Sequence, residues 1–530
     1  MNRYAENTQP QAAEGWQLAH LSSPSGLFGA NGMRMGADGK LYVVQAFGSQ
    51  VSAVDTGSGA CQTVSPVGGP IVAPDDIAFD SHDVMYVTEV MSARVSARTP
   101  NGEVRVIADN VPAANGITAY QDRLFMDECR PDGRLFELYP DGREPRVIAE
   151  NLALPNALSV GPDGNLYFPQ IGVGEIWRCP LEGGVPERFI DGLAVPTAVK
   201  FDQNGLLITT QAASGEVTKI DIQSGEKAII ANVRPGIDNL AIADDNRLFI
   251  SHFVDGGVAE ILANGQERVL VPAGLLGPFG ITVTSDGTVY AADGMSLVAV
   301  SPDGQVSRPT MFTQEGYPGF IRGIASGPAA SVYVTTSAGE VVLYNFNTRE
   351  PHILVNELNE LYDLVQTSDG AVVVAEGGEG RLLKVSGNGD VTVLARGLGR
   401  PNGVVIAGDG SYYVSEPDKG RVSHVNAGTS TLVEGLSSPQ GLALLGDQLL
   451  VVDSGSKELI AVSLGTKQRQ TIVSDLPVGA QPGVTPQPLM GIAGLIQGPL
   501  TSFSGLAVGS DGTVYIAADG EGSVLTLKRT

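Results

Sequence analysis

The sequence predicts an all-β fold made of two tandem six-bladed β-propellers. Three observations lead to this prediction: a unit of roughly forty residues recurs twelve times, each unit holds four short apolar segments, and no segment has a helical period of useful length. The composition agrees, because the 530 residues include 68 Gly and 32 Pro while 42% are hydrophobic. Such a mixture is typical of many buried strands joined by tight turns.

Most repeats open with a polar residue and a short apolar strand, followed by a turn and a second apolar strand. Asn31-Gly32-Met33 precedes a turn at Asp38-Gly39, and Asn402-Gly403-Val404 precedes one at Asp409-Gly410. The first strands begin at positions 31, 75, 115, 156, 197, 238, 279, 322, 362, 402, 440 and 504. Successive starts are 38 to 44 residues apart, except for the last gap of 64, which contains an insertion around residues 482–488.

A third and a fourth strand complete each unit, as at residues 421–425 and 430–433. Four short strands in a unit of this size indicate a propeller blade. Twelve blades exceed the usual four to eight per ring, so we expect two rings, residues 1–265 and 266–530. The segment 16–21 is expected to complete the last blade of one ring. A single open solenoid would leave its end strands uncovered, and a seven-plus-five division is the other alternative.

Charge and cysteine content limit the classes of partner. The 58 acidic residues against 33 Lys and Arg give a net charge of −25, which repels nucleic acid and anionic membranes. Cys61, Cys129 and Cys179 lack CxxC spacing, so neither a disulfide framework nor a thiolate zinc site is indicated. The N-terminus is polar and no run of about 18 apolar residues occurs. We therefore predict a soluble cytoplasmic protein with a small-molecule substrate and leave its oligomeric state open.

The first strand of each blade lines the central channel of a propeller, so residues about forty positions apart converge there. In the first ring all six strand starts carry side-chain oxygen: Asn31, Asp75, Asn115, Asn156, Thr197 and Asp238. Hard oxygen ligands around an axis suit Ca²⁺, Mg²⁺ or Mn²⁺. Alternatively, Asn and Asp begin strands by bonding the neighbouring backbone, and polar channels can hold water alone.

A second polar set stands at the ends of the second strands: Gln45, Glu89, Glu128, Gln170, Gln211 and His252. The acids at this position could simply cap the turn into the third strand. His252 could serve as a general base, a proton shuttle or a metal ligand, since imidazole titrates near neutral pH. A hydrogen-bonded histidine at a strand end is an equally good interpretation.

The second ring differs at its strand starts, which carry no carboxylate: Phe279, Arg322, Tyr362, Asn402, Gln440 and Ser504. Arg322 with Tyr362 could hold an anionic group, because a guanidinium presents a planar fork of donors. A structural pairing of Arg322 is the alternative. The second ring is thus a degenerate copy, a binding surface or a structural clamp.

The first ring resembles the SMP-30/gluconolactonase/LRE-like family in Asn115-Gly116-Ile117, in Asn156-Ala157-Leu158 followed by Asp163-Gly164, and in residues 74–80. The second ring shares only the blade pattern, which NHL-type propellers also have. The family's opening Glu-Gly-Pro or Glu-Ser-Pro is missing, and Asn31-Gly32 stands in its place.

The resemblance implies a six-bladed propeller that hydrolyses lactones with one divalent cation (Ca, Mn, Mg or Zn). On this chain we expect the metal ligands to be Asp75, Asn115, Asn156 and Asp238. The cation would polarise a lactone carbonyl and lower the pKa of bound water, and Asp238 or Asp75 would remove the proton. His252 or Glu128 would relay that proton.

Asn31, Glu89, Thr197, Arg322 and Tyr362 are expected to bind substrate. The predicted function is hydrolysis of a lactone or similar cyclic ester. The alternatives are a lyase or isomerase that stabilises an enolate with the same cation, and a non-catalytic scaffold.

Overall fold

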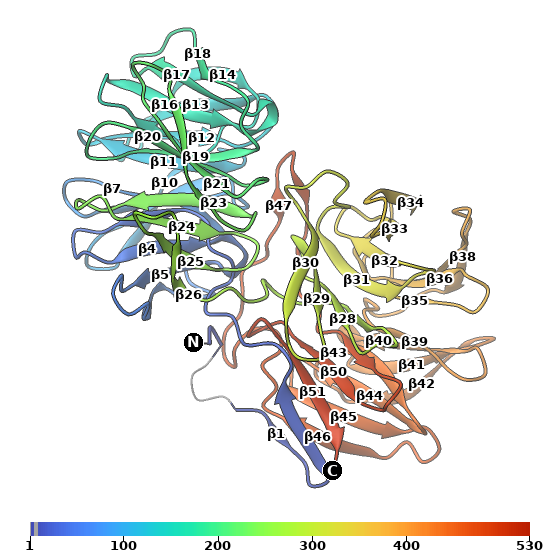
Figure 1. Ribbon diagram of the computed structural model, residues 1–530. Coiled ribbons are helices and arrows are strands. Elements are labelled where there is room, and N and C mark those ends of the chain that lie inside the picture. The colour runs from blue at the N-terminus through green and yellow to red at the C-terminus, as the bar shows by residue number, and fades with distance from the viewer. Residues whose placement is uncertain (1, 5–8) are drawn as a thin grey trace. The chain divides into compact units, whose positions relative to one another are not determined.

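The computed structural model describes residues 2–4 and 9–530 and consists of short antiparallel sheets arranged as blades (Figure 1). Two compact units are present, and we describe each by itself. The first propeller comprises Gly26–Ala273 with Val484–Gln497, and the second comprises Gly274–Gly483 and Gly498–Thr530 with the described part of Met1–Ser25. In the described part of the chain no helix is long and apolar enough to cross a membrane.

The first propeller has six four-stranded sheets, in which the strands follow one another in chain order. From the inside outwards the blades are β3 (Met33–Met35), β4 (Leu41–Gln45), β5 (Gln50–Val54), β6 (Cys61–Ser65); β7 (Pro74–Phe79), β8 (Met85–Glu89), β9 (Arg94–Arg98), β10 (Val104–Asp109); β11 (Ala114–Tyr120), β12 (Arg123–Glu128), β13 (Gly133–Leu138), β14 (Arg146–Leu152); β15 (Ser159–Val160), β16 (Asn165–Gln170), β17 (Glu175–Pro180), β18 (Glu187–Ile190); β19 (Pro196–Phe201), β20 (Leu207–Gln211), β21 (Glu216–Ile220), β22 (Lys227–Asn232); and β23 (Ile237–Ile242), β24 (Leu248–His252), β25 (Val258–Ile261), β26 (Glu267–Val271).

The second propeller also has six blades, two of which take a strand from the N-terminal segment. Its strands are β27 (Ile281–Val283), β28 (Val289–Ala292), β29 (Ser296–Val300), β30 (Val306–Met311); β31 (Ile321–Ser326), β32 (Ser331–Thr336), β33 (Val341–Asn345), β34 (Pro351–Val355); β35 (Leu361–Gln366), β36 (Val372–Glu376), β37 (Arg381–Val385), β38 (Val391–Ala395); β39 (Val404–Ile406), β40 (Tyr412–Glu416), β41 (Arg421–Val425), β42 (Thr429–Glu434); β43 (Pro439–Leu445), β44 (Gln448–Asp453), β45 (Glu458–Ser463), β46 (Arg469–Ser474), β1 (Gln11–Ala12); and β49 (Leu506–Val508), β50 (Val514–Ala518), β51 (Ser523–Arg529), β2 (Trp16–His20). Short 3₁₀ turns follow three second strands: η1 (Ala46–Gly48), η2 (Ile171–Val173) and η3 (Pro417–Lys419).

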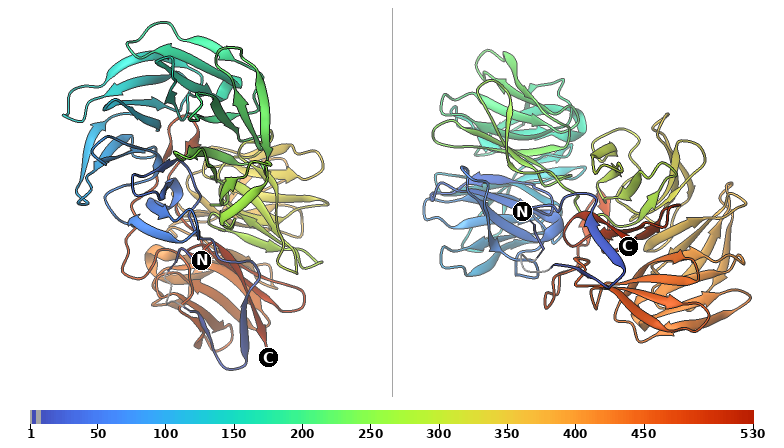
Figure 2. Two further views of the ribbon diagram at one scale, coloured as in Figure 1. Left: turned by 60° about the vertical axis from the view of Figure 1, so that its left-hand side comes forward. Right: turned by 60° about the horizontal axis from the view of Figure 1, so that its bottom comes forward.

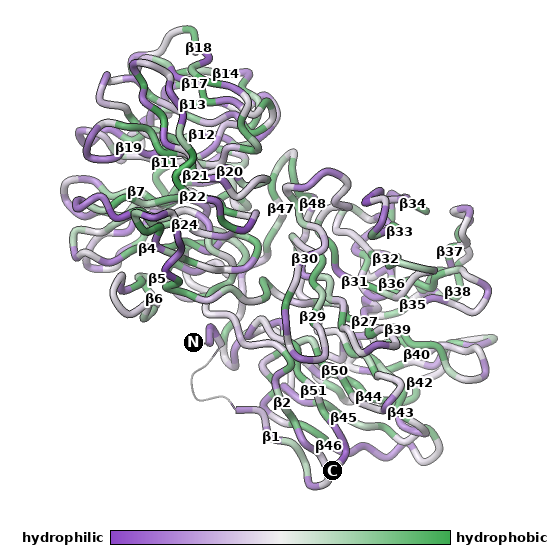
Figure 3. Tube along the Cα trace, in the orientation of Figure 1, coloured by the Kyte–Doolittle hydropathy of each residue, from purple (hydrophilic) through white to green (hydrophobic). Residues whose placement is uncertain are grey.

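Local turn chemistry explains why the repeats fold into hairpins. Gly39 has φ +74°, which favours glycine, and the carboxylate of Asp38 accepts the amide of Lys40 at 3.1 Å. The turn at Asp163-Gly164 has the same construction. Figure 3 shows hydrophobic residues gathered along the strands and hydrophilic ones in many of the connecting turns. The repeated Asp-Gly pairs therefore mark the turn between the first two strands of a blade.

Contacts between innermost strands close each ring. In the first propeller β3, β7, β11, β15, β19 and β23 touch in sequence, and β23 touches β3 again. One apolar cluster joins the last blade to the first, packing Phe249 and Val258 against Leu41 and Val43. The second propeller closes in the same way through β27, β31, β35, β39, β43 and β49. This confirms the predicted twelve blades in two rings of six and excludes the open solenoid.

The N-terminal segment closes the second ring, as expected for residues 16–21. Strand β2 pairs with β51 in a register that sets Trp16 opposite Arg529 and His20 opposite Leu525. The division of the chain differs from the predicted one at residue 265, because β26 completes the sixth blade only at Val271. Because β1 and β2 pair with C-terminal strands, the described part of Met1–Ser25 belongs to the second unit.

Candidate functional site

The six predicted channel residues of the first propeller lie at or just before the start of the innermost strands. We call this set the rim: Asn31, Asp75, Asn115, Asn156, Thr197 and Asp238. At four of them the pairing with the second strand shifts register, for example between Pro74 and Ile77 and between Ile237 and Leu240. Such bulges re-aim side chains at the mouth of a sheet. Asp238 is partly exposed, and the other five rim residues are at most 8% exposed.

Two rim carboxylates from different blades interact strongly. Burial raises the pKa of Asp75 well above its ordinary value, and repulsion from Asp238, Asp76 and Asp127 raises it further. The pKa of Asp238 rises to about 7, mainly through burial and then through repulsion from Asp76, while a hydrogen bond with Asn31 opposes the rise. The structure therefore places Asp238 where its negative charge raises the pKa of Asp75.

The rim amides differ in how their oxygens are engaged. The Oδ1 atom of Asn115 is buried and has no hydrogen-bond partner. In contrast, Oδ1 of Asn156 accepts the amide of Ala157 at 2.7 Å, and Oδ1 of Asn31 accepts the amide of Ala46 at 3.1 Å. Among the described residues no group of three His, Cys, Asp or Glu side chains could hold a metal ion. A cation at the rim would consequently need amide oxygens or water beside Asp75 and Asp238.

A second group of mostly buried charged and polar residues lies on the innermost strands and on β12, and we call it the floor. Its members are Arg34, Asp76, Asp127, Lys200 and Asn239. The carboxylate of Asp76 accepts the amide of Ile117 at 3.0 Å and, from the sixth blade, Nδ2 of Asn239 at 3.2 Å. Arg34 donates to the carbonyl oxygens of Ile77 and Ile117 at 3.2 and 3.0 Å. These bonds tie blades 1, 2, 3 and 6 together near the axis.

Two floor residues have unpartnered charged atoms. Both Nζ of Lys200 and Oδ2 of Asp127 are buried without a hydrogen-bond partner. Burial lowers the pKa of Lys200 to about 7 and Arg34 lowers it further, against the opposing attraction of Asp76 and Asp127. Burial likewise raises the pKa of Asp127 well above its ordinary value. Burial therefore favours the neutral form of both groups.

Sequence reasoning missed the floor, although the repeat held a signal for it. Arg34 and Lys200 both stand three residues after a strand start. Asp127 occupies the position where other blades have a hydroxyl residue, such as Thr88 or Ser251, which accepts the amide after the strand start at 3.0 Å. A carboxylate at a hydroxyl position of the repeat marks blade 3 as different.

The acids at the ends of second strands hold their own blades together. Oε2 of Glu89 accepts the amide of Val72 at 2.7 Å and pairs with Arg94 at 2.7 Å. Gln45, Gln170 and Gln211 accept the equivalent loop amide seventeen residues earlier. The carboxylate of Glu128 is held by Arg130 and Arg134 at 3.2 and 2.6 Å. Glu89 and Glu128 thus make structural contacts within their blades, and their expected roles in substrate binding and catalysis stay predictions.

His252 is fully buried at the end of β24, where its carbonyl oxygen accepts the amide of Ala30 at 3.2 Å. The residue seventeen positions earlier is Pro235, which has no amide hydrogen to donate. Blade 6 thus lacks the loop amide that Gln45, Glu89, Gln170 and Gln211 accept in their blades, and His252 stands at the junction between the sixth and first blades. Thr197 interacts within its own blade, with its hydroxyl 3.1 Å from that of Thr210.

In the second propeller, Arg322 and Tyr362 contact other parts of the chain. The guanidinium of the fully buried Arg322 donates to the carbonyl oxygens of Leu361, at 3.1 Å, and of Pro499. It also lies 5.3 Å from the centre of the Tyr362 ring. The Tyr362 hydroxyl is 2.7 Å from that of Thr501. Residues 499–501 thus contact both side chains, and their expected role in substrate binding stays a prediction.

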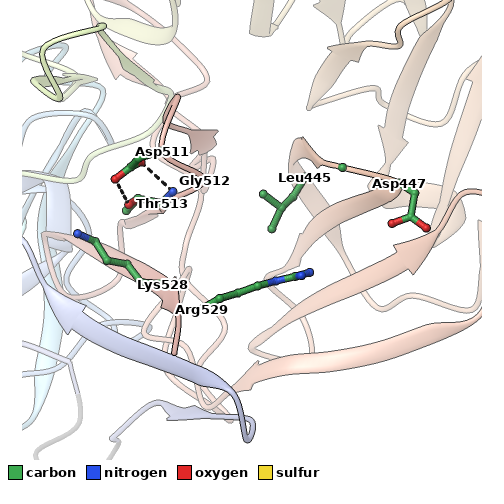
Figure 4. Close-up of a pocket in the computed structure, with 8 residues that line it drawn as sticks. Leu445, Asp447, Asp511, Gly512, Thr513, Lys528 and Arg529 are labelled. Atoms are coloured by element: carbon green, nitrogen blue, oxygen red, sulfur yellow. Dashed lines mark hydrogen bonds between the residues drawn. The ribbon is translucent and has the colours of Figure 1, made fainter.

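A separate surface cavity of about 390 Å³ lies at the turns of the last two blades of the second propeller (Figure 4). Its lining includes Asp447, Asp511, Lys528 and Arg529. The carboxylate of Asp511 is already engaged by the amide and hydroxyl of Thr513 at 2.9 and 2.7 Å. None of the predicted site residues lines this cavity.

Comparisons with known proteins were made for the whole chain. No protein-family model and no curated protein matches it. Similar solved structures include virginiamycin B lyase from Staphylococcus aureus, with 15% identity over 57% of this chain and 99% of that chain and a TM-score of 0.39. Regucalcin, a calcium-binding protein from Agrobacterium tumefaciens, has 16% identity over 44% of this chain and 84% of its own, with a TM-score of 0.36. The extracellular domain of BT4673 from B. thetaiotaomicron has 10% identity over 97% of this chain and 82% of its own, with a TM-score of 0.32. Similarities this low assign no activity, so the chemistry must be inferred from the chain's own residues.

Proposed function

We propose that the first propeller is a metal-dependent hydrolase of a lactone or similar cyclic ester, with one divalent cation at the rim. Two observations carry this proposal: a pair of rim carboxylates with raised pKa values, and one rim amide oxygen without a hydrogen-bond partner. Asp75 and Asp238 repel each other, and Oδ1 of the buried Asn115 is unpartnered. A cation would satisfy all three groups at once.

Charge balance supports a divalent ion. Rim and floor together contain four interacting carboxylates, of Asp75, Asp76, Asp127 and Asp238, against the two cations Arg34 and Lys200. When all six groups are ionised the channel carries a charge of −2, which one divalent ion would neutralise. Carboxylate and amide oxygens are hard ligands of the kind that Ca²⁺, Mg²⁺ and Mn²⁺ prefer.

The chain's own residues would divide the remaining work. Asp75 and Asn115, with Asn156 beside them, would hold the ion, which when bound polarises an ester carbonyl and acidifies water. Asp238, oriented by its hydrogen bond with Asn31, would accept the proton of the attacking water. The walls of the buried rim limit the access of bulk water to these groups.

The test begins with the metal content of the purified protein and its hydrolysis of a lactone panel. We expect about one divalent ion per chain, loss of hydrolysis on chelation and recovery on adding one ion back. Asp75→Asn and Asp238→Asn should each lower kcat/KM by about 100-fold or more. Glu128→Gln, which alters a buried acid outside the rim, is the matched control.

Two results would reject the proposal: a channel without bound metal, or full activity in an Asp75→Asn/Asp238→Asn double variant. Product mass separates the reaction classes, because hydrolysis adds the mass of water whereas a lyase or an isomerase does not.

A further inference from the structure

The insertion before the last blade contributes a hairpin to the first propeller. Val484–Gln497 packs with this unit although the flanking residues belong to the second. Within it β47 (Gly491–Ile492) pairs with β48 (Ile496–Gln497), and the amide of Leu495 donates to the carbonyl of Ile492 at 2.9 Å. Gly494 has φ +80°, as the tight turn requires. We call residues 484–497 the lid hairpin.

The lid hairpin lies on the face of the propeller where the rim opens. A Cβ atom added to Gly68 would stand 2.9 Å from the carbonyl oxygen of Thr485, and one added to Gly494 would stand 3.0 Å from Cδ of Pro131. Gly68 belongs to the loop that leads into β7 and Asp75, and Pro131 follows the end of β12. First strands begin and second strands end on the same face. In the left view of Figure 2 the segment crosses the ring of the first propeller near its centre.

The two sides of this mouth have opposite polarity. Rim and floor present oxygen atoms and charges, whereas residues 489–496 read Leu-Met-Gly-Ile-Ala-Gly-Leu-Ile without one polar side chain. Ile496 is 6% exposed and Ile492 is half-buried, but Met490 remains 60% exposed. Apolar side chains thus lie on the same face as the polar rim, and apolar surface beside a few polar groups is typical of ligand sites.

We infer that the substrate of the first propeller is amphiphilic: a lactone or cyclic ester whose alkyl substituent packs under the lid hairpin while its ester group meets the rim. This inference rests on the proposed function and adds the class of substituent. Burial of one methylene contributes about fourfold to binding. A six-carbon chain that is half covered would therefore gain roughly 50-fold.

The experiment compares kcat/KM for γ-butyrolactone with that for γ-decalactone, which carries a hexyl chain on the same ring. We expect the metal-loaded wild-type protein to prefer γ-decalactone by roughly 50-fold. Met490→Ser/Ile492→Ser should lower that ratio below about fivefold. The control, Val147→Ser/Val185→Ser, alters apolar residues that are 44% and 90% exposed outside the mouth and should keep the wild-type ratio. Circular dichroism would verify that both variants are folded.

A wild-type ratio near one, or a ratio that the lid-hairpin variant does not change, would overturn the inference. Absence of hydrolysis for both lactones would instead count against the proposed function. In that case calorimetric binding of the same two compounds decides: tighter binding of γ-decalactone that the lid-hairpin variant loses supports the inference, and equal binding refutes it.

Discussion

Replacing Lys200 with methionine should change how the stability of the first propeller depends on pH. The pKa of Lys200 falls from its ordinary value of 10.5 to about 7, mainly because the amine is buried and secondarily because Arg34 is near. Between these two values the unfolded chain binds a proton that the folded chain does not. The free energy of unfolding therefore rises with pH across this window, by about 1.4 kcal/mol per pH unit. The cost of burying the charge is complete below pH 7 and absent above pH 10.5.

From pH 7.5 to pH 9.5, the protein with Lys200 should gain about 2–3 kcal/mol of stability relative to Lys200→Met. Met fills a similar volume and has no proton to lose, so its contribution is the same at every pH. The aspartates of the floor remain in both proteins, and their titration largely cancels in the comparison.

The two tryptophans allow this measurement in one propeller of the intact chain. Trp177 lies in β17 of the first propeller, and Trp16 lies in β2, which closes the second. In a Trp16→Phe background, fluorescence during guanidinium unfolding reports on Trp177 alone. Unfolding curves at pH 7.5, 8.5 and 9.5 would be compared with and without Lys200→Met. Lys227→Met, on the exposed outer strand of the same blade, is the control. An equal stability difference at all three pH values would show that Lys200 does not titrate in this window.

Three further predictions concern Asp238, Tyr362 and Glu128. In the metal-free protein, Asp238→Asn should raise the free energy of unfolding by about 3–4 kcal/mol at pH 8 and little at pH 4. The reason is the raised pKa of Asp238, which makes its ionisation costly from about pH 4 to 7. Urea unfolding at the two pH values checks this. Tyr362→Phe should cost about 1–2 kcal/mol in the second propeller by removing the hydroxyl that contacts Thr501 and Arg400; Trp16 fluorescence in a Trp177→Phe background would report it, and an unchanged midpoint would contradict it. Glu128→Gln should lower the unfolding free energy of the first propeller by about 1–3 kcal/mol, because it weakens the pairs with Arg130 and Arg134. Lactone hydrolysis per folded molecule should stay the same. A large loss of kcat/KM would instead indicate a catalytic role for Glu128.

Blade architecture was predictable because its determinants are local. Asp38-Gly39 and Asp163-Gly164 each fix a hairpin through a glycine with positive φ and one carboxylate-to-amide bond, so the repeat can be read directly from residue order. The N-terminal strand was predictable for a related reason. A ring must cover its last edge, and Trp16–His20 is an apolar strand outside the repeats.

Place in the repeat does not predict the contacts of four side chains: Glu89, Glu128, Arg322 and Tyr362. Position alone does not show which groups a side chain will meet. Glu89 meets a loop amide seventeen residues earlier and Glu128 meets two arginines, and both bonds arise only once the blade has folded. Arg322 and Tyr362 do stand on the expected innermost strands, but residues 499–501, which contact both, follow an insertion that has no counterpart in other blades.

The insertion and the residues after it make different contacts in the two propellers. In the second propeller residues 499–501 occupy Arg322 and Tyr362, the two side chains best suited to hold an anion, and the strand starts carry no carboxylate. In the first propeller the rim keeps two carboxylates, and residues 484–497 lie on the same face. A chain cut at the end of the first propeller would therefore keep every rim and floor residue and lose the lid hairpin. We expect the second propeller to matter for the choice of substrate through this hairpin, rather than through a reaction in its own channel.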